Sequence, residues 1–243
     1  MNCTKYAAIY AGLKSDIETG RYPYGGLLPS EAALVEQYGS VRNTVRRAIA
    51  MLVEDGWLLP RRGKGVFVIY EKRERPQIIL NGIETLKEFA VRTGRVVSTR
   101  VLAIDTRLAD GALARRSLFP VGTPLAAVVR VRYVDGVAQI IDHNFFLQTV
   151  AAGLTKELAE DSIYDFLEHT TGLAIVARKQ KITVARADKL DKKHLALDGL
   201  NCVAVLSHQV YDSDGRMFEY TESRHNPLSF VFHNSARRSP QRL

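Results

Sequence analysis

The feature that most constrains the fold is an arginine-rich helix between a tight glycine turn and a basic hairpin. From Ser40 to Asp55 the apolar residues recur at helical spacing and cluster on one side, as do Val45 and Leu52. The opposite side of this helix is polar and carries Arg42, Asn43, Arg46 and Arg47. Taken alone, such a face is more often solvated than bound to a partner, so the flanking segments decide its meaning.

Two helices are predicted before it. Apolar residues recur every three or four positions after Thr4, which is a plausible N-cap, and Gly20 is a plausible stop. Ser30 can cap a second helix, and Glu31 suits the positive end of that helix's dipole. Gly39 then turns the chain into the third helix. Two short helices joined by a glycine turn, the second rich in arginine, are typical of a helix-turn-helix.

The segment after Gly56, W-L-L-P-R-R-G-K-G-V-F-V-I-Y, predicts a β-hairpin with a basic turn. Helix, helix, basic helix and basic hairpin together indicate a winged helix-turn-helix. Its third helix would enter a major groove, and the hairpin would approach phosphates or the minor groove. Arg42 at the helix start can bond guanine O6 and N7, and Lys64 can neutralise phosphate. Residues 1–75 hold 12 Lys and Arg against 8 Asp and Glu, half of the net charge of +8.

Several motifs in residues 4–70 resemble the DNA-binding domain of GntR-type bacterial transcription regulators. These are L-P-S-E, Y-G-x-x-R-x-T-V-R-x-A, L-x-x-x-G and R-x-G-K-G-x-F-V. The resemblance implies that Arg42, Thr44 to Arg46 and Gly63 contact DNA. We predict a DNA-binding domain over residues 1–70, and its site comprises Ser30, Glu31, Arg42, Asn43, Thr44, Arg46, Arg47, Arg61, Gly63, Lys64 and Gly65.

The chain beyond this domain has a different pattern. Residues 71–77, E-K-R-E-R-P-Q, contain no apolar side chain, so they read as a linker to a second domain over residues 78–243. There, helices interspersed with hairpins indicate an α+β domain on an antiparallel sheet. We expect helices at 83–90, 110–118, 162–169 and 188–197, strands at 96–103 and 174–187, and hairpins at 135–136 and 214–215.

Polar residues planted in the predicted strands indicate a possible ligand site. Arg130 and Arg132 alternate with valines, so both project from one sheet face, and Asp142 lies on the paired strand. A second set that shares one strand face comprises Tyr220, Glu222 and Arg224. Such a face is often simply solvated. Alternatively, it forms a polar pocket in which paired arginines clamp a phosphate and carboxylates accept sugar hydroxyls, with Ser162 and Tyr164 adding donors at a helix start.

Residues 78 to 238 resemble the effector-binding domain of the HutC-like branch of the GntR family, whose fold is similar to chorismate lyase. Three motifs, D-S-I-Y-D-F-L-E, V-x-R-x-R-x-x-D-G and E-Y-T-E-S-R-H, resemble trehalose-operon repressors of this branch, which respond to trehalose 6-phosphate. The resemblance implies that the R-x-R and S-x-Y pairs bind phosphate, that loop 82–85 closes over it, and that Asp142 meets the sugar. The predicted effector site comprises Thr85, Arg130, Arg132, Asp142, Ser162, Tyr164, Tyr220, Glu222 and Arg224.

Other function classes lack a signal in the sequence. No apolar run approaches the roughly 18 residues of a membrane span, and residues 1–6 lack the apolar core of a signal peptide, so we expect a cytoplasmic protein. Cys3 and Cys202 are too few for a disulfide framework or a cysteine zinc site. No H-E-x-x-H, G-x-S-x-G or P-loop motif occurs, so we predict no catalytic residue, metal or cofactor.

The sequence therefore predicts a transcription repressor that binds a palindromic double-stranded DNA operator as a homodimer. Its expected effector is a sugar phosphate, with trehalose 6-phosphate the first candidate. An activator in place of a repressor remains open at this point, as do two further alternatives. One is a regulator that senses another small anion, since the paired arginines suit a carboxylate equally well. The other is a lyase-like or hydrolytic enzyme tethered to DNA by its N-terminal domain.

Overall fold

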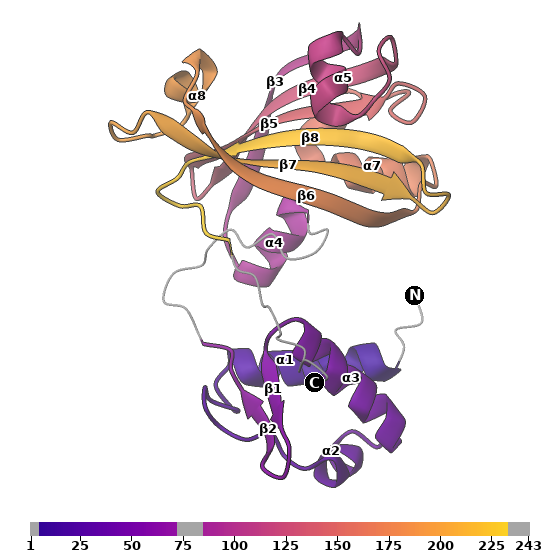
Figure 1. Cartoon of the computed structure of the whole chain (residues 1–243), viewed down its shortest axis with the longest axis vertical. Coiled ribbons are helices and arrows are strands. Elements are labelled where there is room, and N and C mark those ends of the chain that lie inside the picture. Colours follow the sequence, from indigo (N-terminus) through magenta and orange to yellow (C-terminus); the bar gives the residue numbers. More distant parts are fainter. Residues whose placement is uncertain (1–4, 72–84, 233–243) are drawn as a thin grey trace, which may run out of the picture. The chain divides into compact units, whose positions relative to one another are not determined.

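The computed structural model describes residues 5–71 and 85–232, and these form two compact units (Figure 1). The expected N-cap Thr4, nearly all of the expected linker and the loop residues 82–84 lie outside the described residues. Each unit has its own hydrophobic core.

Over residues 5–71, the first unit is a three-helix bundle with a hairpin. Its elements are α1 (Lys5–Glu18), α2 (Glu31–Gln37), α3 (Arg42–Glu54), β1 (Leu58–Arg61) and β2 (Gly65–Val68). The helices bury the apolar stripes predicted for them, and Leu13, Leu34, Val45 and Leu52 are fully buried among them. Because each stripe is buried only when the helices pack together, most of their stability comes from this shared core.

The ends of α2 and α3 follow from local chemistry. The Ser30 hydroxyl accepts a hydrogen bond from the backbone N–H of Ala33 at 3.2 Å, so it caps α2 as predicted. Gly39 has a φ of 52°, and the chain turns there into α3. The helix begins at Arg42, two residues later than predicted, and Ser40 and Val41 precede it in a non-helical conformation. Val41 occupies the N-cap, where its side chain makes no cap hydrogen bond.

Over residues 85–232, the second unit is a six-stranded antiparallel sheet with five helices. The strands are β3 (Val97–Leu108), β4 (Pro124–Val134), β5 (Val137–Leu147), β6 (Ile175–Arg186), β7 (Cys202–Asp212) and β8 (Met217–His225). The helices are α4 (Leu86–Thr93), α5 (Gly111–Ser117), α6 (Lys156–Asp161), α7 (Ile163–Thr170) and α8 (Lys189–His194). The strands lie side by side in the order β3-β4-β5-β8-β7-β6, which the labels of Figure 1 follow. The predicted α+β class is confirmed.

Helix α4 covers Leu86–Thr93 instead of 83–90, the ends of two further elements differ from expectation, and one helix was not predicted. Strand β3 continues to Leu108 instead of 103, because it pairs with β4 as far as Leu108↔Pro124. Helix α8 ends at His194 instead of 197, and α6 was not predicted as a helix. The extension of β3 depends on its pairing with a distant strand, which local pattern does not encode.

The strand register decides which side chains share a face of the sheet. Arg130 lies opposite Asp142, and Asp142 lies opposite Ser223, so these residues on β4, β5 and β8 form one row. Because side chains alternate along a strand, the residues two positions away in each strand join the same face. Helices α4 and α7 cover this face at the cavity described below. Within residues 5–71 and 85–232, no helix has the length and apolar character needed to cross a membrane.

Candidate functional site

The polar face of α3 presents two exposed arginines beside one carboxylate. The side chains of Arg42 and Arg46 are 67% and 63% exposed. Arg46 Nε donates to Glu31 Oε1 at 3.1 Å, and Arg42 Nε lies 3.8 Å from Glu31 Oε2. Glu31 is the first residue of α2, so the packing of α2 on α3 brings this acid to the arginines.

The other predicted DNA-binding residues lie on the same unit in varied settings. The guanidinium of Arg47 stacks 3.9 Å from the ring centroid of Tyr6 on α1, and that of Arg61 lies 5.6 Å from the Phe67 ring. Asn43 is exposed, and Thr44 is partly buried. The residues at the hairpin tip, Arg61, Gly63, Lys64 and Gly65, are exposed. The Ser30 oxygen is already used as the cap of α2.

The second unit contains a polar cavity between the sheet and the segments around α4, α6 and α7. Its lining comes from the beginnings of α4 and α7, the last residue of α6 and five strands. Six of the nine predicted effector residues line it, namely Thr85, Arg130, Arg132, Asp142, Ser162 and Tyr164. The lining also holds four cationic side chains, Lys87, Arg130, Arg132 and Arg178, against the three carboxylates of Asp142, Asp161 and Glu219. The net charge of these groups is +1, which favours an anionic ligand.

A buried ion-pair cluster lies at the centre of the cavity. Arg132 Nε donates to Asp142 Oδ2, and the Ser223 hydroxyl donates to Asp142 Oδ1 at 2.6 Å. Arg130, only 3% exposed, donates from Nε to Asn144 and from Nη1 to the Ala159 carbonyl, both at 3.0 Å. Burial would raise the pKa of Asp142, but the two arginines hold it well below its usual value.

The charge of Arg130 survives its burial. Burial, with Arg132 beside it, lowers the pKa of Arg130 to about 9, while Asp142 acts in the opposite direction. The guanidinium is therefore still protonated at neutral pH. Arg132, with 17% of its side chain exposed, is the arginine of the pair that is more accessible from the cavity.

A second polar cluster, centred on Glu219, was missed by the sequence interpretation. Glu219 Oε2 accepts from the Tyr164 hydroxyl at 2.7 Å, and Oε1 accepts from the Thr221 hydroxyl at 2.6 Å. Burial alone would raise the pKa of Glu219, but the contacts with His208 and the two hydroxyls lower it. Burial beside this carboxylate raises the pKa of Tyr164 well above its usual value. The cluster can accept hydrogen bonds from a polyhydroxylated ligand and donate hydrogen bonds to it.

One histidine of the lining is buried and neutral. His225 is 1% exposed, and burial lowers its pKa to about 4. Its Nε2 has no hydrogen-bond partner among the described residues. Its place in the E-Y-T-E-S-R-H motif was visible in the sequence, but nothing there indicated that its side chain lines the cavity.

The prediction that Tyr220, Glu222 and Arg224 line the pocket is wrong. They share a face of β8, as the alternation predicted, but it is the face turned away from the cavity. Strand β8 instead contributes Glu219, Thr221, Ser223 and His225 to the cavity. Polar residues occupy both faces of this strand, so the sequence could not select between them. The pairing of Asp142 with Ser223 makes the selection.

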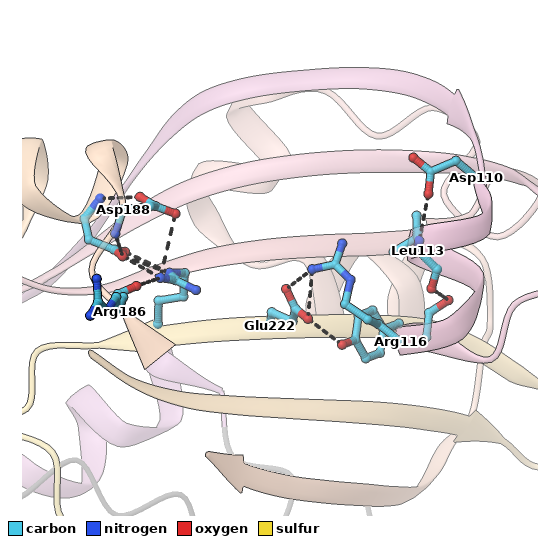
Figure 2. A network of polar contacts seen from close by, with 10 residues as sticks. Asp110, Leu113, Arg116, Arg186, Asp188 and Glu222 are labelled. Carbon is cyan, nitrogen blue, oxygen red and sulfur yellow. Dashed lines mark hydrogen bonds and ion pairs between the residues drawn. The ribbon is translucent and has the colours of Figure 1, made fainter. Parts of the chain in front are cut away.

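On that opposite face of the sheet, the contacts of these three residues connect strand β8 to helices α5 and α8. Figure 2 shows Arg116 of α5 reaching Glu222. The distance from Arg116 Nη1 to Glu222 Oε2 is 3.0 Å, and the Tyr220 hydroxyl donates to the same carboxylate at 2.7 Å. Arg224 donates from Nη2 to the fully buried Asp191 of α8 at 2.6 Å, and to the carbonyl of Arg186 at 3.1 Å. These contacts tie α5 and α8 to the sheet.

In the part of the chain that the structure describes, no group of three or more His, Cys, Asp or Glu residues is arranged to hold a metal ion. The polar groups of the cavity are suited to bind and orient a small anion through hydrogen bonds and charge.

Comparisons with known proteins agree with this geometry. Residues 5–68 match the family "Bacterial regulatory proteins, gntR family", and residues 92–230 match the UTRA domain. The chain is 33% identical to the HTH-type transcriptional regulator TreR of Bacillus subtilis, over 98% of this chain and 99% of that protein.

Two solved structures are also similar. A possible transcriptional regulator, YydK from B. subtilis, has a TM-score of 0.79 and 21% identity, over 96% of this chain and 99% of that one. The effector-binding domain of the B. subtilis trehalose repressor has a TM-score of 0.52 and 30% identity. It covers 58% of this chain and 99% of its own.

A winged DNA-binding unit joined to a small-molecule effector domain defines a ligand-responsive transcription regulator. The chain belongs to the gntR family of bacterial regulatory proteins, among the members that carry a UTRA domain.

Proposed function

We propose that this regulator is a repressor of a sugar-utilisation operon, released from its operator by a sugar phosphate. The observation that carries the proposal is the pair Arg130 and Arg132 in a cavity of net positive charge, beside hydroxyl and carboxylate groups. Arginine forks match the geometry of phosphate oxygens, and the Glu219 cluster suits sugar hydroxyls. Trehalose 6-phosphate is the first candidate, because the effector domain that is 30% identical is that of a trehalose repressor.

The cavity residues divide into two roles in this proposal. Arg132, the more accessible arginine, contacts the phosphate. Asp142 has one oxygen engaged by Arg132 and the other by Ser223, so we assign it to positioning the arginines instead of to the sugar contact expected from the sequence. Ser162 caps α7 by accepting from the Asp165 N–H at 3.2 Å, and Thr85 caps α4, so both place backbone at the cavity wall.

Two chains bound together to a palindromic operator would repress transcription. The effector would release them if it favours an arrangement of the two chains that cannot bind the operator. When two half-sites are bound together, the sequence specificity exceeds that of one small DNA-binding unit alone. The ligand shifts this equilibrium only by the difference in its affinity for the two arrangements. Equal effector affinity for free and DNA-bound protein would exclude this mechanism. Light scattering should show a particle of twice the 27.1 kDa chain mass.

Operator binding followed by fluorescence anisotropy tests the proposal. The duplex is selected from a random library against the wild-type protein, and the complex is titrated with trehalose 6-phosphate, trehalose or glucose 6-phosphate. Selective release by trehalose 6-phosphate supports the proposal. If none of the three compounds releases the protein from the duplex, the effector is to be sought among other anions, such as carboxylates. Recovery of chemically altered ligand after incubation would instead favour the tethered enzyme.

Arg132→Ala is expected to weaken trehalose 6-phosphate binding roughly 10- to 150-fold, since a hydrogen bond to a charged group contributes about 1.5–3 kcal/mol. Isothermal titration calorimetry measures the affinity, and anisotropy should show unchanged operator binding. The matched control is Arg116→Ala, whose side chain reaches Glu222 on the opposite sheet face. Unchanged affinity in the Arg132 variant would remove that residue from the effector site.

Arg42→Ala is expected to lower operator affinity by about 1–3 kcal/mol and to relax base preference at one position of each half-site, as loss of a base contact does. Lys64→Ala, at the hairpin tip, serves as the contrast. It should weaken all sequences similarly and flatten the dependence on salt. Anisotropy against selected and scrambled duplexes at several salt concentrations measures both effects. A wild-type preference retained in the Arg42 variant would contradict the placement of α3 in the groove.

A further inference from the structure

We infer that Glu31, the first residue of α2, determines the DNA specificity of α3: it orients Arg46 and Arg42 and opposes binding to non-operator DNA, without itself contacting a base. The inference rests on the proposed role of α3 in the major groove. A carboxylate can accept a hydrogen bond from cytosine N4, which would make Glu31 a base contact. The structure favours another role, because both oxygens of Glu31 face guanidinium groups.

The geometry lets one acid serve two arginines. Arg42 and Arg46 are four residues apart on α3, so they lie one above the other on the same helix face. Glu31 meets each at Nε, at 3.8 Å from Arg42 and 3.1 Å from Arg46. The hydrogen bond from Arg46 therefore uses the inner edge of the guanidinium. The Nη groups remain for the bidentate contact that arginine makes with guanine.

Stability of the free protein does not account for this arrangement. All three side chains are more than a third exposed, and an ion pair of this kind contributes little to folding. Two properties of the DNA-bound state are more sensitive. Holding both arginines in one orientation reduces the conformational entropy lost when they meet base edges. A negative charge beside them also repels every phosphate backbone, whatever its sequence.

These two effects differ between operator and other DNA. On the operator, the oriented guanidinium groups offset the repulsion through base contacts. On a scrambled duplex only the repulsion remains. The carboxylate therefore increases the ratio of operator to non-operator affinity, which is the quantity that matters for finding a site among many competitors.

The test compares Glu31→Gln with Glu36→Gln in the full-length protein. The first change keeps the shape of the side chain and removes its charge. The second removes the same charge on the same helix, at an exposed residue that makes no ion pair within residues 5–71 and 85–232. Anisotropy is measured with a duplex selected in vitro against the wild-type protein and with a scrambled duplex of equal composition, at four salt concentrations.

Glu31→Gln should raise affinity for the scrambled duplex about 3- to 10-fold, steepen its salt dependence, and leave operator affinity equal or lower. Glu36→Gln should change either affinity less than 2-fold. The inference fails if the two variants behave alike, or if Glu31→Gln strengthens both duplexes equally. Glu31→Ala provides a second variant, and melting curves verify that each variant is folded. A wild-type protein that prefers no selected duplex would contradict the proposed function instead.

Discussion

Asp142→Asn is expected to lower the free energy of unfolding of the effector unit by about 3–5 kcal/mol, because it leaves buried guanidinium groups without their carboxylate. Asp142 is 4% exposed, accepts from Arg132, and lies 3.8 Å from Arg130 Nη2. Removing one partner of a buried pair costs more than the pair contributes, since the remaining charge stays desolvated. Urea unfolding followed by circular dichroism measures the change.

The control for this variant is Asp214→Asn, the same chemical change at an exposed residue of the turn between β7 and β8. Its expected effect is within about 0.5 kcal/mol, as for most surface substitutions. Equal stability of the two variants would show that Asp142 does not compensate the arginines.

The contribution of Asp142 to the free energy of unfolding also depends on pH. Its pKa in the folded protein lies well below the usual value, so the stabilisation is complete above the unfolded pKa of about 3.9 and is lost as pH falls toward the folded value. The difference in unfolding free energy between wild type and Asp142→Asn should therefore be constant near neutral pH and shrink below about pH 4. A difference that grows on acidification would have the wrong sign for this account.

Arg224→Met is expected to destabilise the same unit by about 3–5 kcal/mol, while leaving effector affinity unchanged. The carboxylate of Asp191 is fully buried and receives hydrogen bonds from Arg224 Nε at 2.9 Å and Nη2 at 2.6 Å. Methionine fills similar space but leaves this carboxylate without its cation. Because Arg224 lies on the face away from the cavity, ligand contacts are untouched.

Arg116→Met is the matched control for Arg224→Met. It breaks an ion pair on the same sheet face, but the Arg116 side chain is 54% exposed, so a loss below about 1 kcal/mol is expected. Denaturant unfolding compares the two variants, and calorimetry with trehalose 6-phosphate reports the cavity. Loss of ligand affinity in a folded Arg224→Met protein would restore Arg224 to the effector site.

Local patterns were sufficient for much of the architecture. The apolar stripes of α1, α2 and α3 recur at helical spacing, Ser30 provides a cap, and the glycine-bearing basic turn lies between two β-rich runs. Each of these signals acts over a few residues, so it can be recognised in the sequence without knowing which segment packs against it. The alternation around Arg130 and Arg132 likewise placed both on one face, and the structure brings them together with Asp142.

Ligand-site residues far apart in the chain were harder to assign. Glu219 and His225 line the cavity, but they are 89 and 95 residues beyond Arg130, and no local motif connects them to it. Their role depends on β8 pairing with β5, which lies between β4 and β8 in the sheet. The ion pairs of Glu31 with the arginines of α3 similarly depend on how two helices pack.

The sequence by itself determined the order of elements, the polar face of α3 and the pairing of two arginines on one strand face, because helical and strand periodicities are local. Only the tertiary structure decided which face of β8 meets the cavity. Successive side chains point to opposite sides of a strand, so shifting the register by one residue exchanges Tyr220, Glu222 and Arg224 with their neighbours. With polar residues on both sides, hydrophobic alternation cannot choose, and the cross-strand partner Asp142↔Ser223 makes the choice.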